Sequence, residues 1–321
     1  MPTPDRVAFS IGPITVHWYG IMIMLGVILA SYIAYREAKR RHEDPDHVWQ
    51  LFPWVLIAGI AGARLGFVVA SLGDPRYQDI TNVFKIWEGG LSIQGAVIGG
   101  ALAVIIYCRR YHISFFKWAD IIVPGVALAQ AVGRWGNYFN QEAFGGPTDL
   151  PWGINIDVDR QQAVAGQVFG PSVRFHPTFA YEMVWDLLNF ALLMWLGRQR
   201  RFRLLQGDLL WVYLIFYSVG RFAIEEIRVD SATVGGFRTP QIIAILTIVL
   251  AWAMLIYRHR PGSTASYSES NLPEDEEAAI ITERTRSEAP ARRASRVRRI
   301  TPTSNQEMQT AATSESGAEG Q

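Results

Sequence analysis

Seven apolar stretches, each close to the length of a membrane span, constrain the fold of this chain more than any other feature. A hydrocarbon core of about 30 Å is crossed by roughly 20 apolar residues in a helix. The stretches lie at residues 17–35, 49–71, 91–108, 118–136, 178–196, 208–226 and 240–257. Because a lipid environment requires every backbone polar group to be satisfied internally, each stretch is predicted to be helical. The sequence thus predicts an all-α polytopic membrane protein with seven transmembrane helices.

The last part of the chain differs in composition from the rest. Residues 261–321 hold 17 of the 59 charged residues and neither Trp nor Phe, whereas all eleven tryptophans lie before residue 261. This segment has too little apolar surface to offset the entropy cost of ordering it. We therefore expect a seven-helix membrane domain over residues 1–260 and a disordered tail over residues 261–321.

Cysteine content and net charge exclude several classes of protein. The only cysteine is Cys108, which excludes a disulfide framework and a multi-cysteine metal site. The net charge of +1 gives no indication of nucleic-acid binding. We expect no metal, no cofactor and no nucleic-acid partner.

Basic residues alternate between the two sides of the predicted membrane domain. Residues 36–48, 109–117 and 197–207 hold 11 Lys or Arg in 33 positions, whereas residues 1–16, 72–90, 137–177 and 227–239 hold 7 in 89. The positive-inside rule then places the N-terminus outside and, after seven spans, the C-terminal tail in the cytoplasm. Strong positive charges follow the first apolar stretch instead of preceding it, so a retained helix is expected there and not a cleaved signal peptide.

Ionisable side chains inside the sixth stretch form a regular pattern. Tyr217, Arg221, Glu225 and Arg228 recur at spacings of four, four and three, which places them on one face of a helix. Such residues are costly in a membrane and therefore indicate a functional site. The alternative is that Arg221 and Glu225 simply neutralise each other as an i, i+4 pair.

A second polar group lies at the outer end of the fourth stretch. Residues 133–142 read GRWGNYFNQE and combine glycines, amides and opposite charges. Together with the sixth stretch, this segment would bring two arginines, Arg134 and Arg221, to face outward at one depth.

Other polar and small residues also lie inside the stretches. Arg64 has no acidic neighbour in its own helix, so it is expected either to pair with Glu182 or Asp186 of the fifth stretch or to contact a substrate. Two pairs of glycines four residues apart, which favour close packing of membrane helices, are Gly62 with Gly66 and Gly95 with Gly99.

The segment at residues 133–142, followed by Gly145, resembles the signature of prolipoprotein diacylglyceryl transferases. Further segments agree in the same order: HWYG at 17–20, GGLS at 89–92, HPT at 176–178 with Tyr181 and Glu182, and residues 217–225. The resemblance covers residues 10–258 and has no counterpart for the tail. It departs from the family at Gln94, where a histidine is often found, and a glutamine amide cannot take a proton at neutral pH.

The resemblance implies a reaction. The diacylglyceryl group of phosphatidylglycerol would pass to the thiol of the lipobox cysteine in the signal peptide of a prolipoprotein, forming a thioether and releasing glycerol phosphate. The implied location is a multi-pass protein of the bacterial plasma (inner) membrane, with its active site facing the outer leaflet. The implied partners are phosphatidylglycerol, the prolipoprotein signal peptide and membrane lipids.

The chemistry of that reaction suggests roles for individual residues. The departing phosphate gains negative charge, which the forked guanidiniums of Arg134 and Arg221 suit. The reacting thiol belongs to the substrate, so the enzyme needs no cysteine of its own.

Candidates for the general base are Glu225, Glu142 and Tyr217, with His17 and His176 also open. Catalytic residues are expected to be Arg134, Arg221, Tyr217 and Glu225. Substrate contacts are expected from Arg134, Asn137, Asn140, Glu142, Gly145, Tyr19 and Gln94. A small-solute transporter and a non-catalytic lipid-binding scaffold are the competing hypotheses.

Overall fold

The computed structural model describes residues 3–12, 14–71, 84, 89–231 and 233–263. Its long helices are α1 (Trp18–Arg40), α2 (Asp46–Ala70), α3 (Ile93–Arg110), α4 (Phe115–Asn140), α6 (Thr178–Leu196), α7 (Asp208–Glu225) and α8 (Thr239–Arg258). Each predicted stretch coincides with one of these helices to within five residues at either end. The predicted tail lies outside the described residues from residue 264 onwards, as does most of the loop at residues 72–90.

Six helices in the described part of the chain are long and apolar enough to cross a membrane: α1, α2, α3, α4, α6 and α8. Helix α7 is not among them, and its 18 residues include three charged side chains, Asp208, Arg221 and Glu225. The prediction of a largely helical, multi-pass membrane protein is confirmed in this form. The seventh span and the orientation of the termini remain proposals.

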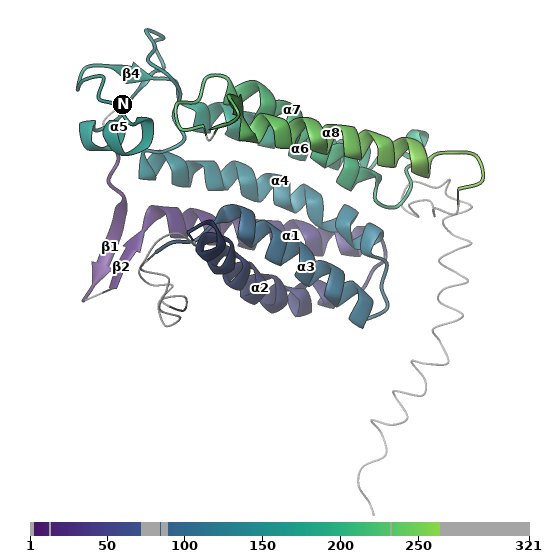
Figure 1. Cartoon of the computed structure of the whole chain (residues 1–321). Helices are drawn as coiled ribbons and strands as arrows, with labels where there is room; N and C mark the ends of the chain where they lie inside the picture. The colour runs from purple at the N-terminus through teal and green to yellow at the C-terminus, as the bar shows by residue number, and fades with distance from the viewer. Residues whose placement is uncertain (1–2, 13, 72–83, 85–88, 232, 264–321) are drawn as a thin grey trace, which may run out of the picture. The chain divides into compact units, whose positions relative to one another are not determined.

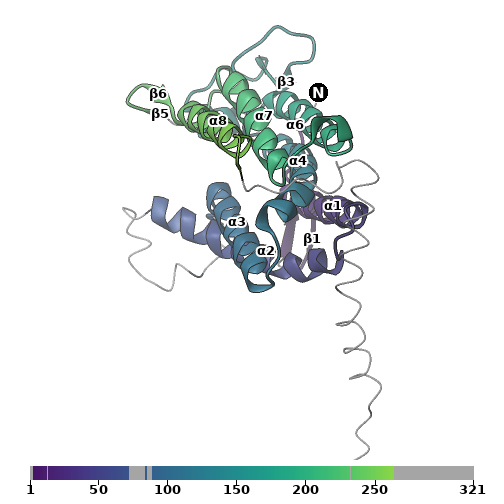
Figure 2. The same ribbon diagram turned by 90° about the vertical axis from the view of Figure 1, so that its right-hand side faces the viewer.

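Helix α4 lies between two groups of helices (Figures 1 and 2). Helices α1, α2 and α3 lie on one side of it, and α6, α7 and α8 lie on the other. Half of the apolar window of α4 is buried, against at most 28% for any other candidate span. Small residues permit this central position: a Cβ on Gly125 would lie 2.6 Å from the carbonyl oxygen of Ala30 in α1. The centre of the domain is therefore a helix that carries one of the predicted arginines.

The glycine pairs in α2 and α3 lie at the closest approach of these two helices, as predicted. A Cβ on Gly95 would lie 2.1 Å from the carbonyl oxygen of Gly62, and a Cβ on Gly99 would lie 2.2 Å from that of Ala58. Neither distance leaves room for a methyl group. Backbone contact of this kind is how small residues hold membrane helices together.

Replacing Gly95 by alanine is expected to lower the stability of the protein by about 1–3 kcal/mol, because the added methyl group pushes α2 and α3 apart. The measurement is the midpoint of thermal unfolding in detergent. Gly100 provides the matched control, since a Cβ there meets only Val55 at 3.6 Å, an ordinary contact. Equal midpoints for the two alanine variants would contradict the close approach.

Short strands and one short helix lie beyond one end of the bundle, where α1 begins (Figure 1). None of them was predicted from the sequence. They are the antiparallel pairs β1 (Val7–Ile11) with β2 (Ile14–His17), β3 (Ile154–Asn155) with β4 (Arg174–Phe175), and β5 (Thr233–Val234) with β6 (Phe237–Arg238), and helix α5 (Val158–Ala165). Phe144, Ile154 and Phe175 form a small hydrophobic core at this end. This is the end that the charge distribution predicts to be outside.

Candidate functional site

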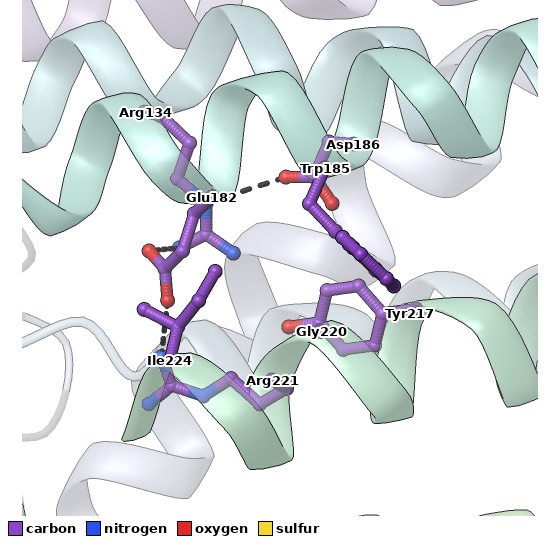
Figure 3. Close-up of a pocket in the computed structure, with 8 residues that line it drawn as sticks. All are labelled: Arg134, Glu182, Trp185, Asp186, Tyr217, Gly220, Arg221 and Ile224. Carbon is purple, nitrogen blue, oxygen red and sulfur yellow. Dashed lines mark hydrogen bonds and ion pairs between the residues drawn. The ribbon is translucent and has the colours of Figure 1, made fainter. Parts of the chain in front are cut away.

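A small, partly open pocket lies where α4, α6 and α7 meet near this end (Figure 3). Its lining residues are Arg134, Glu182, Trp185, Asp186, Tyr217, Gly220, Arg221 and Ile224. Arg134 lies near the end of α4, Glu182 near the start of α6, and Arg221 near the end of α7. Residues that are far apart in the sequence therefore converge because α4 and α7 run in the same direction and α6 runs back between them.

The carboxylate of Glu182 is the centre of the site. It is only 3% exposed, and its Oε2 atom lies 3.0 Å from Nη1 of Arg134. Its Oε1 atom pairs with Nη1 of Arg221 and lies 3.3 Å from Nη1 of Arg228. One buried carboxylate thus binds three guanidiniums, two from inside the helices and one from just beyond α7.

Each arginine also has a carboxylate partner of its own. Nε of Arg134 lies 3.4 Å from Oδ2 of Asp186, Nη2 of Arg221 lies 2.7 Å from Oε2 of Glu225, and Nη2 of Arg228 lies 2.8 Å from Oδ2 of Asp230. The i, i+4 pair considered from the sequence is therefore present, but it is one part of a larger network. Four carboxylates compensate three guanidiniums, so the positive charges are held in place without an external anion.

Arg228 lies outside the helix and stays charged in this network. Burial alone would lower the pKa of its guanidinium, but the carboxylates of Glu182, Asp230 and Glu225 outweigh that effect and raise the pKa above its ordinary value. Arg228 therefore keeps its positive charge at any physiological pH.

Aromatic side chains form the inner wall of the pocket. The indole of Trp185 stacks on Phe216 at 4.5 Å and donates a 2.7 Å hydrogen bond to its carbonyl oxygen. Gly220 makes this possible, because a Cβ there would lie 2.2 Å from the Trp185 ring. Tyr217 lines the pocket beside Arg221, with its hydroxyl pointing into the pocket (Figure 3). The guanidiniums therefore face a wall that is mostly aromatic.

A second polar cluster follows directly from α4. The carboxylate Oε1 of Glu142 accepts hydrogen bonds from Nδ2 of Asn137 at 3.0 Å and from Nδ2 of Asn140 at 3.4 Å. Gln141 ends the helix in the left-handed conformation, with φ of 51°, and so turns the chain back over its last turn. The structure thus brings together three of the residues predicted to contact substrate.

Tyr19 packs on the end of α4. Its ring lies directly on Gly136, where a Cβ would lie 2.6 Å from Cδ2 of the tyrosine. The start of α1 therefore contacts the segment that carries Arg134 and Asn137.

Gly145 occupies a position of tight packing. Its amide donates to the carbonyl oxygen of His176 at 2.9 Å, and a Cβ would lie 2.7 Å from Cβ of His176 and 2.9 Å from the carbonyl oxygen of Ile227. The residue ties the segment after α4 to the segments that precede α6 and follow α7. It can position the site without contacting a substrate.

Gln94 and Arg64 lie away from the pocket. Gln94 is exposed at the start of α3, where its Oε1 accepts a 2.9 Å hydrogen bond from Ser92. Arg64 of α2 donates to the carbonyl oxygens of Gly89 and Gly90 at 2.6 and 3.0 Å. The prediction that Arg64 pairs with Glu182 or Asp186 was wrong, because those carboxylates bind Arg134, which packs nearer to α6.

Two features of the site were not predicted from the sequence. Glu182 was expected as a possible partner of Arg64 and is part of the family resemblance, but its central place in the site was not predicted, although a buried acid near the start of a span signals a partner in some other helix. The second feature is the contact between Trp185 of α6 and Gly220 of α7, where the indole lies in the space that a side chain on Gly220 would fill. No sequence pattern indicated this contact. Among the described residues, no group of three His, Cys, Asp or Glu side chains is arranged to hold a metal ion.

Comparisons with known proteins identify the family of this chain. Residues 6–257 match the family described as prolipoprotein diacylglyceryl transferase. The phosphatidylglycerol–prolipoprotein diacylglyceryl transferase of Chloroflexus aggregans is 41% identical over 276 residues, which cover 80% of this chain and 90% of the relative. The protein of that name from Synechococcus elongatus is 41% identical over 258 residues (79% and 88%), and that from Listeria innocua is 37% identical over 270 residues (84% and 95%). The chain belongs to the prolipoprotein diacylglyceryl transferase family.

Proposed function

We propose that this protein transfers the diacylglyceryl group of phosphatidylglycerol to the lipobox cysteine of prolipoproteins, the first step of lipoprotein maturation. The cysteine sulfur forms a bond to the terminal glycerol carbon of the diacylglyceryl group, and the bond from that carbon to the phosphate oxygen breaks. Glycerol phosphate leaves with the electron pair, and the thiol proton passes to a base. The product is a thioether, and the phosphodiester becomes a phosphomonoester with more negative charge.

The observation that carries this proposal is the convergence of Arg134 and Arg221 in one pocket. Both side chains keep 18–19% of their surface exposed, so an anionic group can reach them. Guanidiniums are suited to a leaving phosphate because they offer parallel donors and hold their charge throughout the reaction. In the free protein Glu182 occupies these donors, and the phosphate of the lipid would share or replace its contacts.

The other predicted residues fit supporting roles. Tyr217 lines the arginine pocket and Glu225 pairs with Arg221. Asn137 and Asn140 donate to Glu142, where the glycerol hydroxyls could be bound, and Tyr19 packs on Gly136 of the same segment. The positions of Gly145 and Gln94 give no direct support for substrate contact, and their predicted role stays a prediction.

The proposed function also requires a particular topology. We propose that α7 is the seventh span, that the N-terminus and the pocket face the outer leaflet, and that the chain from residue 261 onwards is a cytoplasmic tail. The pairing of Arg221 with Glu182 and Glu225 supports this, because paired charges cost less to place in a membrane. In intact cells, an impermeant thiol reagent should label a cysteine at the exposed position Trp152 but not one at Phe202. Labelling at position 202 but not at position 152 would show that the topology is the reverse of the one proposed.

The direct test of function uses the full-length protein in vesicles that contain phosphatidylglycerol, with a synthetic lipobox peptide. Loss of peptide thiol should equal release of glycerol phosphate, and a peptide with serine in place of the cysteine should give neither. A transporter would move a solute without consuming thiol, and a lipid-binding scaffold would retain lipid without releasing glycerol phosphate. Absence of both products would exclude the proposed transferase.

We assign the general base to Glu142. Oε2 of Glu225 lies 2.7 Å from Arg221 and 3.8 Å from Arg228, so this carboxylate is engaged in ion pairs, whereas Glu142 accepts hydrogen bonds from the neutral amides of Asn137 and Asn140. Glu142→Gln is therefore expected to lower kcat at pH 7 by about 10- to 30-fold, because a thiol with a pKa near 8.5 is only a few per cent ionised there. The deficit should shrink as the pH rises towards 9, since the thiol then ionises unaided.

The measurement is the pH dependence of kcat for the wild-type protein and for Glu142→Gln. Glu226→Gln is the matched control, because Glu226 is exposed and accepts a hydrogen bond from Gln241 away from the pocket. A loss in Glu142→Gln that stays constant between pH 7 and 9 would assign Glu142 to substrate binding and not to proton transfer.

A further inference from the structure

Asp120 lies at the opposite end of α4 from Arg134, in a position that the proposed chemistry does not use. Its carboxylate is 1% exposed and accepts two backbone hydrogen bonds from the start of α7: from Gly207 N to Oδ2 at 2.7 Å and from Leu210 N to Oδ1 at 3.1 Å. Helix α7 has no side-chain cap of its own, because Gly207 is its N-cap residue, with φ of 96°. A residue of one helix therefore caps another.

The two hydrogen bonds have a defined geometry. In a capping box, two side chains share the task of binding the N–H groups of the N-cap and N3 positions. Asp120 binds both groups of α7 with one carboxylate, and its negative charge also suits the positive end of the helix dipole. Such a contact fixes the position of α7 along its axis relative to α4 and not merely the distance between the helices.

The spacing from this contact to the two arginines is the same on both helices. Arg134 follows Asp120 by 14 residues, and Arg221 follows Gly207 by 14 residues. At 1.5 Å per residue, each arginine lies about 21 Å along its helix from the cap. Because α4 and α7 run in the same direction from this point, equal spacing brings both guanidiniums to one depth, where Glu182 binds them.

A second bond joins the same helices between the two ends. The hydroxyl of Tyr213 in α7 donates to Oε1 of Gln130 in α4 at 2.9 Å. This bond involves two long side chains, which tolerate small shifts, whereas the Asp120 contact is made to the backbone. Asp120 is accordingly the contact that determines the register.

We propose that Asp120 is a positioning residue of the transferase, which sets the relative depth of Arg134 and Arg221 by capping α7 from α4. The inference rests on the proposed function for its catalytic consequence. Asp120 touches neither substrate nor reacting atoms and acts through the placement of α7. A slip of α7 by a fraction of a turn would separate the two guanidiniums in depth and misplace the leaving phosphate between them.

The experiment uses the full-length chain with Cys108→Ser and nitroxide labels on cysteines at Gly133 and Val219, reconstituted in phosphatidylglycerol vesicles. A Cβ at Gly133 meets no atom within 4 Å, and Val219 is 42% exposed, so both positions accept a label. Pulsed electron spin resonance gives the distance between the labels, which flank the arginines. The kcat and KM of transfer are measured on unlabelled protein carrying the same Asp120 substitution.

The matched control is Asp208→Asn. Asp208 is 2% exposed at the same end of α7, but its Oδ2 accepts from Leu205 N at 2.8 Å and pairs with His259 at 2.8 Å, which are contacts that do not involve α4. The Asp120→Ala variant should shift or broaden the label distance and lower kcat by about tenfold or more. The Asp208→Asn variant should leave the label distance unchanged. Asp120→Asn, which keeps one acceptor oxygen, should fall between wild type and Asp120→Ala.

Two results would overturn the proposal: a label distance in Asp120→Ala equal to that of wild type, or an equal shift in Asp208→Asn. If Asp120→Ala does not accumulate in the membrane, Asp120→Asn decides, and an unchanged distance in that variant overturns the proposal as well. Wild-type protein that releases no glycerol phosphate would refute the proposed function, while the label distances would still show whether Asp120 sets the register of α7.

Discussion

Replacing Arg134 or Arg221 by alanine is expected to lower kcat by about 10²- to 10³-fold, the loss typical for removal of one donor that stabilises developing charge. The reason is the change of charge on the phosphate during the reaction. An interaction that strengthens as the leaving group gains charge raises kcat, whereas one that is equally strong in substrate and transition state changes only KM. Both arginines contact the pocket from different helices, so neither can replace the other. Release of glycerol phosphate in vesicles is the measurement.

Two further variants separate this effect from a loss of structure. Arg221→Lys keeps the charge but loses the forked donors, so its kcat should lie between those of wild type and Arg221→Ala. Arg198→Ala removes a 42% exposed arginine that pairs with Glu37 at 2.7 Å in the same domain but outside the pocket. Its turnover should stay within about twofold of wild type, because the buried Glu37 keeps its pair with Arg40 at 2.8 Å and the change lies away from the pocket. Near-normal rates in both alanine variants of the pocket would refute charge stabilisation by these arginines.

Much of the fold was predictable because membrane spans have a strong and simple sequence signal. All seven apolar stretches are helices, and the longest disagreement is at the end of α1, which continues to Arg40. Its last turn is charged yet helical, because Glu37 there is buried and pairs with Arg40 at 2.8 Å and with Arg198 at 2.7 Å. A hydropathy pattern cannot anticipate an ion network that extends a helix beyond its apolar part.

The sequence predicted which site residues share a face of one helix, but not which residues of different helices contact each other. The face that carries Tyr217, Arg221 and Glu225 follows from helical spacing alone, and the structure places Arg221 beside Glu225 as that spacing requires. The partner of Glu182 depends on which helices are neighbours, and this is decided by small residues at the helix contacts. Because α2 packs closely on α3 through Gly62 and Gly95, Arg64 lies with the carbonyl groups before α3 and not with Glu182.

The largest effect from a residue outside the predicted site is expected for Glu182. Glu182→Gln should lower kcat by about a hundredfold, because three guanidiniums lose the carboxylate that orients them, and a small misplacement of catalytic groups has a cost of that order. The KM for phosphatidylglycerol should fall at the same time. The carboxylate competes with the lipid phosphate for the same donors, and the neutral amide competes less. Steady-state kinetics with varied lipid content in the vesicles gives both constants.

Asp186→Asn is the matched control for this prediction. Asp186 is buried beside Glu182 on the same helix, but its carboxylate pairs, within the described part of the chain, with Arg134 alone, at 3.4 Å, and its loss leaves Arg221 and Arg228 bound to Glu182. Its effects on kcat and KM should therefore be smaller than those of Glu182→Gln. A rise in KM for Glu182→Gln would mean that the carboxylate helps to bind the lipid, which would contradict the competition.

The double variant Arg221→Ala/Glu182→Gln distinguishes positioning from independent contributions. If Glu182 acts by holding Arg221, then Glu182→Gln should have little further effect on kcat in a protein that already lacks Arg221. The double variant should therefore be only slightly slower than the slower of the two single variants. Independent residues would instead multiply their losses, to a combined decrease of about 10⁴-fold or more. The coupling is expected to be strong because the two groups share one buried ion pair, and residues in direct contact are those for which additivity fails.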